Sequence, residues 1–264
     1  MADEAFDFID FPMRSSKPRS DGLTMMIDWG LPLALQSDVV AGANRYIDMA
    51  KIAATMAGVM PRGLLEEKIA AYRSAGISTS QGGLFTEMAY MQGKIEPFFE
   101  RIAELGFDAV EISDNLLNWS LADKERAIRL AIEEFGLKVL GEVGRKDAAM
   151  DDDTLLEDLR ITVDAGAMSV FVEAYELFAG DTIREELIAK IAERHPSDTI
   201  IYELPVVVLP GVTREFKHKV AVWMVDAFGS NVNLANVEWD EIWMTEIIRR
   251  RGGDNLVEPD STRI

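Results

Sequence analysis

The stretch IEPFFERIAELGFDAVEIS, residues 95–113, has the pattern of an amphipathic helix followed by a short buried strand. Apolar residues recur at three- and four-residue spacing up to Leu105, which is typical of a helix with one buried face. Gly106 follows, at the point where a helix end favours a residue with positive φ. The run AVEIS (109–113) then reads as a buried strand. The stretch therefore predicts one helix–strand unit of an α/β fold.

The same unit repeats along the chain at a constant interval. Gly76, Gly106, Gly136 and Gly166 are 30 residues apart, each at or just past the end of an amphipathic stretch. These amphipathic stretches are 63–75, 95–106, 121–136, 154–166 and 182–195. The short buried runs are 23–28, 46–53, 76–81, 109–113, 138–143, 169–174, 199–204 and 231–236. Eight strands alternating with helices predict an α/β fold of the (β/α)8 TIM-barrel type in a single domain.

A doubly wound open sheet is the alternative, because alternation of strands and helices does not show that a sheet closes. The length of 264 residues favours the barrel, since one such domain uses about 250 residues. We expect residues 1–20 to form an N-terminal extension, residues 21–251 the barrel and residues 252–264 a polar C-terminal tail.

Composition narrows the class of partner. A formal net charge of −19 disfavours nucleic acid and anionic membranes as partners. No apolar run approaches the roughly 20 residues that cross a bilayer, and the acidic start does not resemble a secretory signal. The absence of cysteine excludes thiolate nucleophiles and zinc–thiolate sites. We expect a cytoplasmic homo-oligomer that acts on a small anionic molecule.

Polar residues are concentrated at the predicted carboxyl ends of the strands, where the active site of such a barrel lies. These residues are Asp28, Lys51, Glu111, Asp114, Glu142, Glu173, Glu203, Asn233 and Asn236. Any one of them could mark only the exit of a strand into solvent. A ring of carboxylates facing one lysine is harder to explain in that way, because converging carboxylates repel one another unless a divalent cation, protonation or nearby Lys and Arg neutralise them. Mg²⁺ is the simplest such cation.

The stretch KVLGEVGRKDA, residues 138–148, places two cations just past the fifth predicted strand. Arg145 and Lys146 would then lie on a loop at the mouth of the barrel. A lysine in such a place can act as a proton donor, because neighbouring cations and partial burial lower its pKa. The alternative is a solvated pair that balances the acidic residues 151–153, and the sequence alone does not choose between the two.

Several blocks of the chain occur together in one order and spacing. They are KPRSDGLTMMIDWGLP, YIDMAKIAATMA, QGGLFTEMAY, LGFDAVEISDN, GEVGRKDA, DAGAMSVFVEA and GSNVNLANVEWDEI. Over nearly the whole chain they resemble the phosphosulfolactate synthase family, whose members add sulfite to phosphoenolpyruvate and which includes a plant group of heat-stress-associated proteins. The blocks around residues 142–148 and 229–236 are the most specific.

The resemblance implies a TIM barrel, a Mg²⁺ requirement and a substrate of the phosphoenolpyruvate type. Attack of sulfite on the methylene carbon moves charge into the substrate carboxylate, which Mg²⁺ can stabilise, and a general acid protonates the neighbouring carbon. Lys146 matches the lysine expected to donate this proton, and Lys51 matches a lysine suited to hold an anion.

The resemblance also implies roles for the other strand-end residues. The acids from which metal ligands are drawn are Glu111, Asp114, Glu173 and Glu203, with Glu142 assigned to the same set and to catalysis beside the two lysines. The expected substrate contacts are Arg145, Gly82, Gly83, Tyr175, Asn233 and Asn236. The two asparagines lie in GSNVNLAN, near the loops where such barrels commonly hold phosphate.

The chain departs from the family pattern at several of these blocks. Trp29 stands where many members have Lys or Asn, and Leu84 stands in place of a threonine. IAATM (52–56) replaces FGWGT. Tyr175 replaces an arginine able to hold an oxyanion at two points. These changes argue against the usual way of binding sulfite with phosphate.

Three hypotheses follow for the function. The first is a Mg²⁺-dependent lyase that joins sulfite to phosphoenolpyruvate. The second is a lyase of the same type with a different nucleophile or acceptor, which the loss of an arginine at Tyr175 favours. The third is a noncatalytic barrel protein with a binding or stress-protective role, which the retention of Lys51, Lys146 and the acids disfavours.

Overall fold

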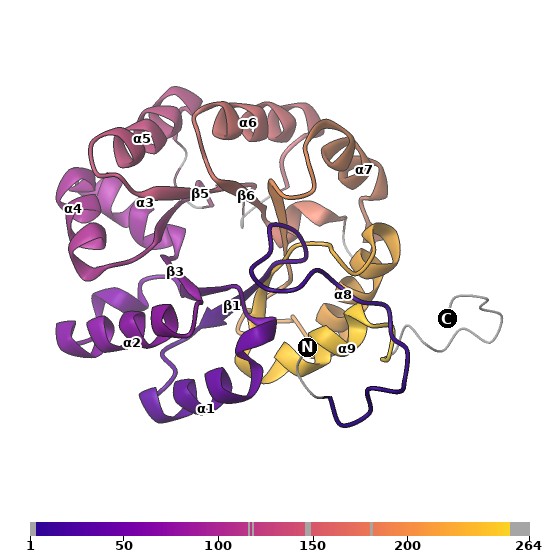
Figure 1. Ribbon diagram of the computed structural model, residues 1–264. Helices are drawn as coiled ribbons and strands as arrows, with labels where there is room; N and C mark the ends of the chain where they lie inside the picture. Colours follow the sequence, from indigo (N-terminus) through magenta and orange to yellow (C-terminus); the bar gives the residue numbers. More distant parts are fainter. Residues whose placement is uncertain (1–3, 116, 118, 146–148, 180–181, 254–264) are drawn as a thin grey trace.

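A computed structural model of the chain describes residues 4–115, 117, 119–145, 149–179 and 182–253. Eight parallel strands close into a barrel in the order β1-β10-β9-β6-β5-β4-β3-β2 (Figure 1). The strands are β1 Thr24–Asp28, β2 Met49–Ile52, β3 Ser78–Gln81, β4 Ala109–Ile112, β5 Lys138–Val143, β6 Ser169–Val172, β9 Ile200–Glu203 and β10 Leu234–Glu238. The predicted TIM barrel is confirmed, and the open-sheet alternative is wrong because β1 pairs with β10.

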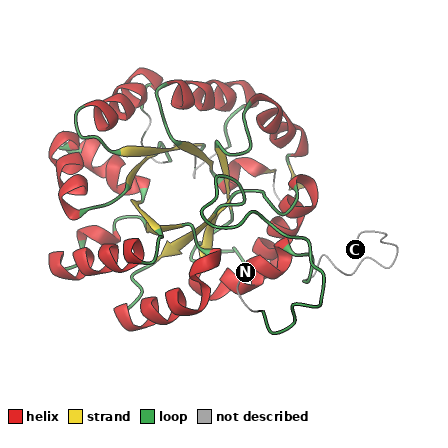
Figure 2. Ribbon diagram, viewed as in Figure 1, coloured by secondary structure: helices red, strands yellow, loops and turns green. Residues whose placement is uncertain are grey.

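Helices surround the barrel on its outside (Figure 2). They are α1 Leu33–Ala43, α2 Arg62–Ser74, α3 Gly83–Met91, α4 Ile95–Leu105, α5 Leu121–Glu133, α6 Asp152–Asp164, α7 Glu185–Arg194, α8 Arg214–Phe228 and α9 Ile242–Arg249. A small hairpin of β7 Phe178–Ala179 and β8 Thr182–Ile183 lies between β6 and α7. Within the described part of the chain, no helix has the length and apolar character that a membrane span requires.

The four periodic glycines have the backbone that their spacing predicts. Gly76, Gly106, Gly136 and Gly166 all adopt positive φ, between 63° and 104°. At Gly106 this conformation terminates α4, and the chain then turns into β4. The 30-residue repeat is therefore a repeat of helix ends.

The barrel interior holds an apolar layer contributed by seven strands. Its residues are Met25, Met49, Ala109, Leu140, Phe171, Ile201 and Ala235. Because side chains alternate along a strand, the residue two positions later faces the same interior, one layer nearer the carboxyl ends. A larger apolar cluster lies between the outer face of the strands and the helices. The apolar layer thus forms the base on which the next layer stands.

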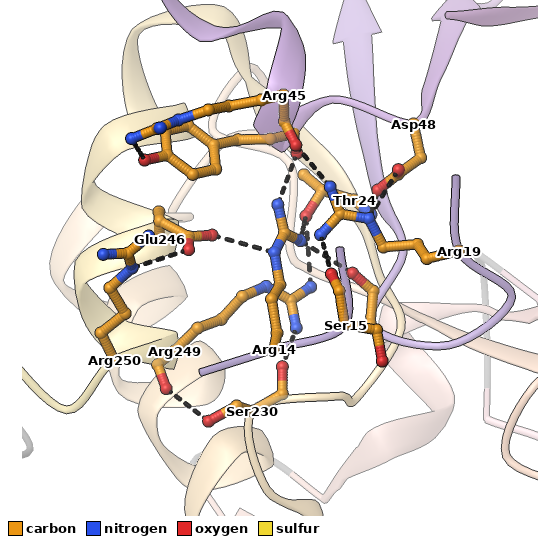
Figure 3. Close-up of polar contacts among 12 residues, drawn as sticks. Arg14, Ser15, Arg19, Thr24, Arg45, Asp48, Ser230, Glu246, Arg249 and Arg250 are labelled. Atoms are coloured by element: carbon orange, nitrogen blue, oxygen red, sulfur yellow. Dashed lines mark hydrogen bonds and ion pairs between the residues drawn. The ribbon is translucent and has the colours of Figure 1, made fainter. Parts of the chain in front are cut away.

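The end of the N-terminal extension is packed against the barrel (Figure 3). We call residues 14–22 the N-terminal strap. Arg14 donates hydrogen bonds to the carbonyl of Gly22 at 2.7 Å and to Thr24 Oγ1 at 2.8 Å, and it pairs with Glu246 of α9 at 3.0 Å. Arg19 pairs with Asp48 at 2.9 Å. The strap is therefore fixed to the barrel by buried polar contacts, and the boundary at residue 20 between extension and barrel stays a prediction.

Arg249 completes the same end of the barrel from the C-terminal side (Figure 3). This fully buried side chain of α9 donates to the carbonyls of Val232 at 2.6 Å and Leu23 at 3.0 Å. Burial, with Arg14 close by, lowers the pKa of Arg249 to about 9. The seam between β1 and β10 is thus bridged by arginines at the end opposite the carboxyl ends of the strands.

Candidate functional site

Five ionisable residues stand one layer above the apolar base of the barrel. They are Lys51, Glu111, Glu142, Glu173 and Glu203, each two positions after an apolar residue of the base layer. All five are buried, with exposed fractions of 6% or less. The structure therefore brings together the residues that the sequence placed at five strand ends.

Lys51 lies between two of the carboxylates. Its Nζ is 2.9 Å from Glu111 Oε2 and 2.9 Å from Glu203 Oε1, and it stands 4.7 Å from the centre of the Phe171 ring. Burial alone would lower the pKa of Lys51, but Glu111 and Glu203 outweigh that effect and raise it. Lys51 is therefore a fixed cation and is poorly suited to give up a proton.

A three-carboxylate cluster lies next to this lysine. Oxygens of Glu142, Glu173 and Glu203 lie within 4.8 Å of one another, and Asn115 donates a hydrogen bond to Glu142 at 2.8 Å. Burial, together with the charges of Glu142 and Glu203, raises the pKa of Glu111 to about 8 even with Lys51 in contact. Among the described residues, four buried carboxyl groups therefore meet one lysine, which leaves an excess of acidic groups over cations. Buried oxygen ligands with such an excess charge fit a hard divalent cation.

A cavity of about 560 Å³ opens above these residues. Lys51, Glu111, Glu173, Glu203, Asn115 and Asn236 form its polar part. Apolar and aromatic side chains form most of the remaining wall, and they include Ile27, Trp29, Leu84, Tyr175, Phe178, Leu204, Pro205, Val206, Leu209, Pro210, Val212 and Phe216. The cavity thus has a charged floor and an apolar wall.

Gly82 and Gly83 line the cavity, as expected for substrate contacts. Their N–H groups are engaged inside the protein, because Gly82 donates to the carbonyl of Ile52 at 3.0 Å and Gly83 donates to Glu111 Oε1 at 2.6 Å. A Cβ at Gly83 would lie 2.2 Å from Ser113 Oγ. The glycines therefore allow β3, β4 and α3 to approach closely, and their role toward a ligand stays a prediction.

The two asparagines of GSNVNLAN lie at opposite ends of the barrel. Asn236 lines the cavity with positive φ (59°), and its Oδ1 is buried with no hydrogen-bond partner within the described residues. Asn233 precedes β10, donates to the carbonyls of Ser197 and Ile200, and accepts from the N–H of Leu23. The expectation that Asn233 contacts substrate is wrong in its placement, because β10 begins three residues later than predicted.

Asp114 lies outside the carboxylate cluster, although we expected it among the metal ligands. It pairs with Lys124 at 3.2 Å, and Lys124 is also 2.9 Å from Asp158. Burial and the nearby charge of Asp158 raise the pKa of Asp114 to about 8. Asp114 lies two residues past the end of β4, and its pairing with Lys124 of α5 places its carboxyl group toward α5 and α6.

The loop after β5 carries Arg145 and Lys146. The N–H of Arg145 donates to Glu176 at 3.0 Å. Lys146 lies outside the described residues, so its expected role as proton donor stays a prediction. Tyr175 lies in the short 3-10 helix after β6, is 52% exposed and lines the cavity, and its expected contact with substrate stays a prediction.

Two buried carboxylates that the sequence analysis did not single out fix the loops around the site. Glu87 of α3 accepts from the N–H groups of Asn115 at 3.0 Å and Leu117 at 2.7 Å. Glu176 accepts from the N–H groups of Arg145 and Met150, both at 3.0 Å. The sequence did not reveal Glu87, because the buried face of α3 is polar or small and carries no apolar stripe.

Known proteins with similar sequences point to one family. The family model described as (2R)-phospho-3-sulfolactate synthase (ComA) matches residues 12–254. The chain is 33% identical to the phosphosulfolactate synthase of Methanothermobacter thermautotrophicus, over 96% of this chain and 97% of that protein. It is 22% identical to Protein HEAT-STRESS-ASSOCIATED 32 of Arabidopsis thaliana, over 90% of this chain and 89% of that one.

The comparison with solved structures concerns the fold alone. A 3-hexulose-6-phosphate synthase from Salmonella typhimurium superposes with a TM-score of 0.55 at 12% sequence identity, over 87% of this chain and 99% of that one. At this identity only the barrel is shared. The family match over residues 12–254, together with 33% identity to a synthase of nearly equal length, shows that the chain belongs to the (2R)-phospho-3-sulfolactate synthase family.

Proposed function

We propose that the protein is a lyase of the phosphosulfolactate synthase type, which adds sulfite or another nucleophile to phosphoenolpyruvate or a related anionic substrate. The observation that carries this proposal is Lys51, held at 2.9 Å from both Glu111 and Glu203 beside the cluster of Glu142, Glu173 and Glu203. Lyases of this family give the reaction class, and the floor of the cavity offers the groups that an anionic substrate and its metal ion require.

The three-carboxylate cluster would hold Mg²⁺, since carboxylates this close together repel one another and would also repel an anionic substrate. A bound Mg²⁺ would supply Lewis-acid stabilisation of charge that develops on the substrate carboxylate. Lys51 stays protonated, because its carboxylate neighbours raise its pKa. Lys51 therefore serves as a cation that binds negatively charged groups at the floor of the cavity. Another group must donate the proton to carbon. Family resemblance assigns that role to Lys146.

The first experiment combines metal binding with turnover. Purified protein is mixed with phosphoenolpyruvate and a sulfur nucleophile, with Mg²⁺ or with EDTA, and the phosphorus NMR signals are followed. We expect loss of phosphoenolpyruvate without release of inorganic phosphate, and only in the presence of Mg²⁺. Calorimetry should show Mg²⁺ binding that is lost in Glu142→Gln and Glu203→Gln. No Mg²⁺ affinity with or without phosphoenolpyruvate would overturn the metal assignment.

A second function is a noncatalytic barrel protein with a binding or stress-protective role. Trp29, Leu84 and Tyr175 favour it, because all three line the cavity and are the positions at which the chain departs from the family pattern. Intact phosphoenolpyruvate after incubation with Mg²⁺ and every nucleophile tested would support this alternative.

We also propose that the protein works in the cytoplasm as a homo-oligomer. The lack of cysteine suits a reducing compartment. Exposed apolar side chains on the N-terminal extension and α9 suit a subunit contact: Phe6, Phe8, Met13, Trp243 and Met244 are each at least 41% exposed. Light scattering coupled to size-exclusion chromatography tests the oligomer, and a monomeric mass would contradict it.

A further inference from the structure

The wall of the cavity is apolar where a second reactant must sit. Trp29, Leu84, Phe178, Leu209 and Phe216 all line it, and the rings of Phe178 and Phe216 meet edge to face at 5.2 Å. These side chains come from the loops after β1 and β9, from β7, and from α3 and α8, so the apolar surface is not confined to one element. An enclosed apolar surface of this kind is typical of sites for organic ligands.

Charge at the cavity is unfavourable for a small dianion such as sulfite. Lys51 is the one cation among the described lining residues, and both of its close partners are carboxylates of the protein. Asn236 adds a buried carbonyl oxygen without a hydrogen-bond partner among the described residues, which is an acceptor and not a donor. Beside phosphoenolpyruvate, itself an anion, no further cation among the described lining residues offers charge to a second dianion.

The size of the cavity also favours an organic ligand. Its 560 Å³ lies within the range of pockets that enclose drug-sized organic molecules. If both reactants were small polar anions, the apolar wall would stay in contact with water. The free energy gained by burying that apolar surface would then be lost.

We propose that the second reactant is an organic nucleophile with a single negative charge and an apolar group of about aromatic size. Its apolar group lies against Leu84, Leu209 and Phe216, and its nucleophilic atom faces the charged floor. The inference rests on the proposed lyase function and names the class of nucleophile for it. Inorganic sulfite is then a poor substrate of this protein.

Benzenesulfinate is a matched probe, since it differs from sulfite by a phenyl ring in place of one charged oxygen. In the reaction, the sulfur lone pair forms the carbon–sulfur bond to the methylene carbon of phosphoenolpyruvate. The electrons of the double bond move to the neighbouring carbon, which takes one proton from a general acid. The product is a sulfone that keeps the phosphate, and no oxidant or reductant is needed.

Binding is measured first, by calorimetry in the presence of Mg²⁺ and phosphoenolpyruvate at a temperature where turnover is slow. We expect benzenesulfinate to bind at least about tenfold more tightly than methanesulfinate, because the phenyl ring leaves water for the apolar wall. Sulfite should bind more weakly than either. Equal affinities for benzenesulfinate and methanesulfinate, or tighter binding of sulfite, would overturn the inference.

Variants of the wall test where the apolar group lies. Leu84→Thr and Leu209→Thr should each remove most of the preference for benzenesulfinate, with little change in the affinity for methanesulfinate. Met168→Thr is the control, because Met168 is 44% exposed and precedes β6 at the opposite end of the barrel. If Leu84→Thr and Leu209→Thr keep the full preference, the apolar group lies elsewhere and the inference fails.

Turnover separates this inference from the proposed function. Phosphoenolpyruvate consumed with sulfite but not with benzenesulfinate would refute the inference and leave the lyase function standing. Tight benzenesulfinate binding without consumption of phosphoenolpyruvate by any nucleophile would refute the lyase function and leave the ligand preference as a property of the cavity. Consumption that is faster with benzenesulfinate supports both.

Discussion

Lys51 is the residue on which the charge of the floor depends. Lys51→Met would leave Glu111 and Glu203 without the cation that lies 2.9 Å from each. We expect a loss of about 3–5 kcal/mol in the free energy of unfolding at pH 9 in EDTA, measured in urea. The loss should be smaller at pH 6, because the pKa of Glu111 is about 8 and its carboxyl is then neutral.

A surface lysine provides the control for this experiment. Lys219 pairs with Glu215 at 2.8 Å on the exposed face of α8, so Lys219→Met should leave the unfolding curve nearly unchanged at both pH values. A Lys51→Met protein as stable as the natural one at pH 9 would show that Glu111 and Glu203 do not need Lys51.

Asp114 gives a prediction for the pH dependence of stability. Burial and Asp158 raise its pKa to about 8 from the ordinary 3.8 of an aspartate, so the folded protein holds this proton between about pH 4 and pH 8 while the unfolded chain does not. The stability contributed by the proton is complete below pH 4 and is lost as the pH rises toward 8. Asp114→Asn removes this titration.

Urea unfolding in EDTA at several pH values measures the effect. We expect the free energy of unfolding of Asp114→Asn to fall less steeply between pH 5 and pH 8 than that of the natural protein. The same slope in both proteins would mean that the carboxyl of Asp114 is already ionised at pH 5.

Site residues could be predicted from the sequence where a residue both faces inward, by the two-residue alternation of its strand, and lies near the end of that strand. Glu111, Glu142 and Glu203 each fall at an inward position near the end of a strand, so the sequence identified them. Asn233 lies away from the cavity because the last strand begins three residues later than predicted, and such a shift moves a side chain toward the other end of the barrel. Asp114 follows the end of β4, where strand alternation no longer sets the direction of a side chain. Lys124, which holds Asp114, comes from a helix, and strand period does not reveal it.

At the scale of elements, Glu176 holds the loop between β5 and α6. Its carboxylate accepts from the N–H groups of Arg145 and Met150 and pairs with Arg184 at 3.2 Å. We expect Glu176→Gln to loosen this loop, because a neutral amide offers one acceptor oxygen where the carboxylate offers two. Hydrogen exchange of the peptide 144–151 should become at least several-fold faster, with exchange in α2 unchanged. Equal exchange in both proteins would mean that other contacts hold the loop.

Elements with polar buried faces escaped prediction. The buried residues of α3 are Gly83, Thr86, Glu87 and Ala89, so its sequence lacks the apolar stripe that identifies a helix. The buried residues of α1 are Gln36 and Ala43, so its sequence also lacks an apolar stripe. By contrast, α4 buries Phe99 and Ile102, and its bounds were predicted to within one residue. Helices that pack through hydrogen bonds have no signature in hydrophobic periodicity.

The N-terminal strap gives a prediction at the scale of the whole molecule. Deletion of residues 1–20 removes Arg14 and Arg19 and leaves Glu246 and Asp48 without these partners at the seam between β1 and β10. We expect a loss of several kcal/mol, or failure to fold, since buried ion pairs lose one member each. Deletion of residues 1–13 keeps both arginines and should cost far less. Thermal unfolding compares the two, and equal stability of both truncated proteins would contradict a structural role for the strap.

The fold as a whole could be predicted from the repeat of helix ends, because each βα unit carries its own glycine signal. Closure could not be predicted, since it depends on pairing between the first and the last strand, and no local pattern encodes that contact. The chain length favoured a closed barrel, and the pairing of Thr24 in β1 with Leu234 in β10 shows that the barrel is closed.

The seam has a consequence for the order of events during synthesis on the ribosome. Ser15 bonds to Asn231, 216 positions away, and Arg249 bonds to Leu23, 226 positions away. Until the last fifty residues emerge, β1 and β9 are bare parallel edges of an incomplete sheet, which are open to pairing with other nascent chains. Closure then waits for β10, and its rate is limited by the search of two distant segments for each other.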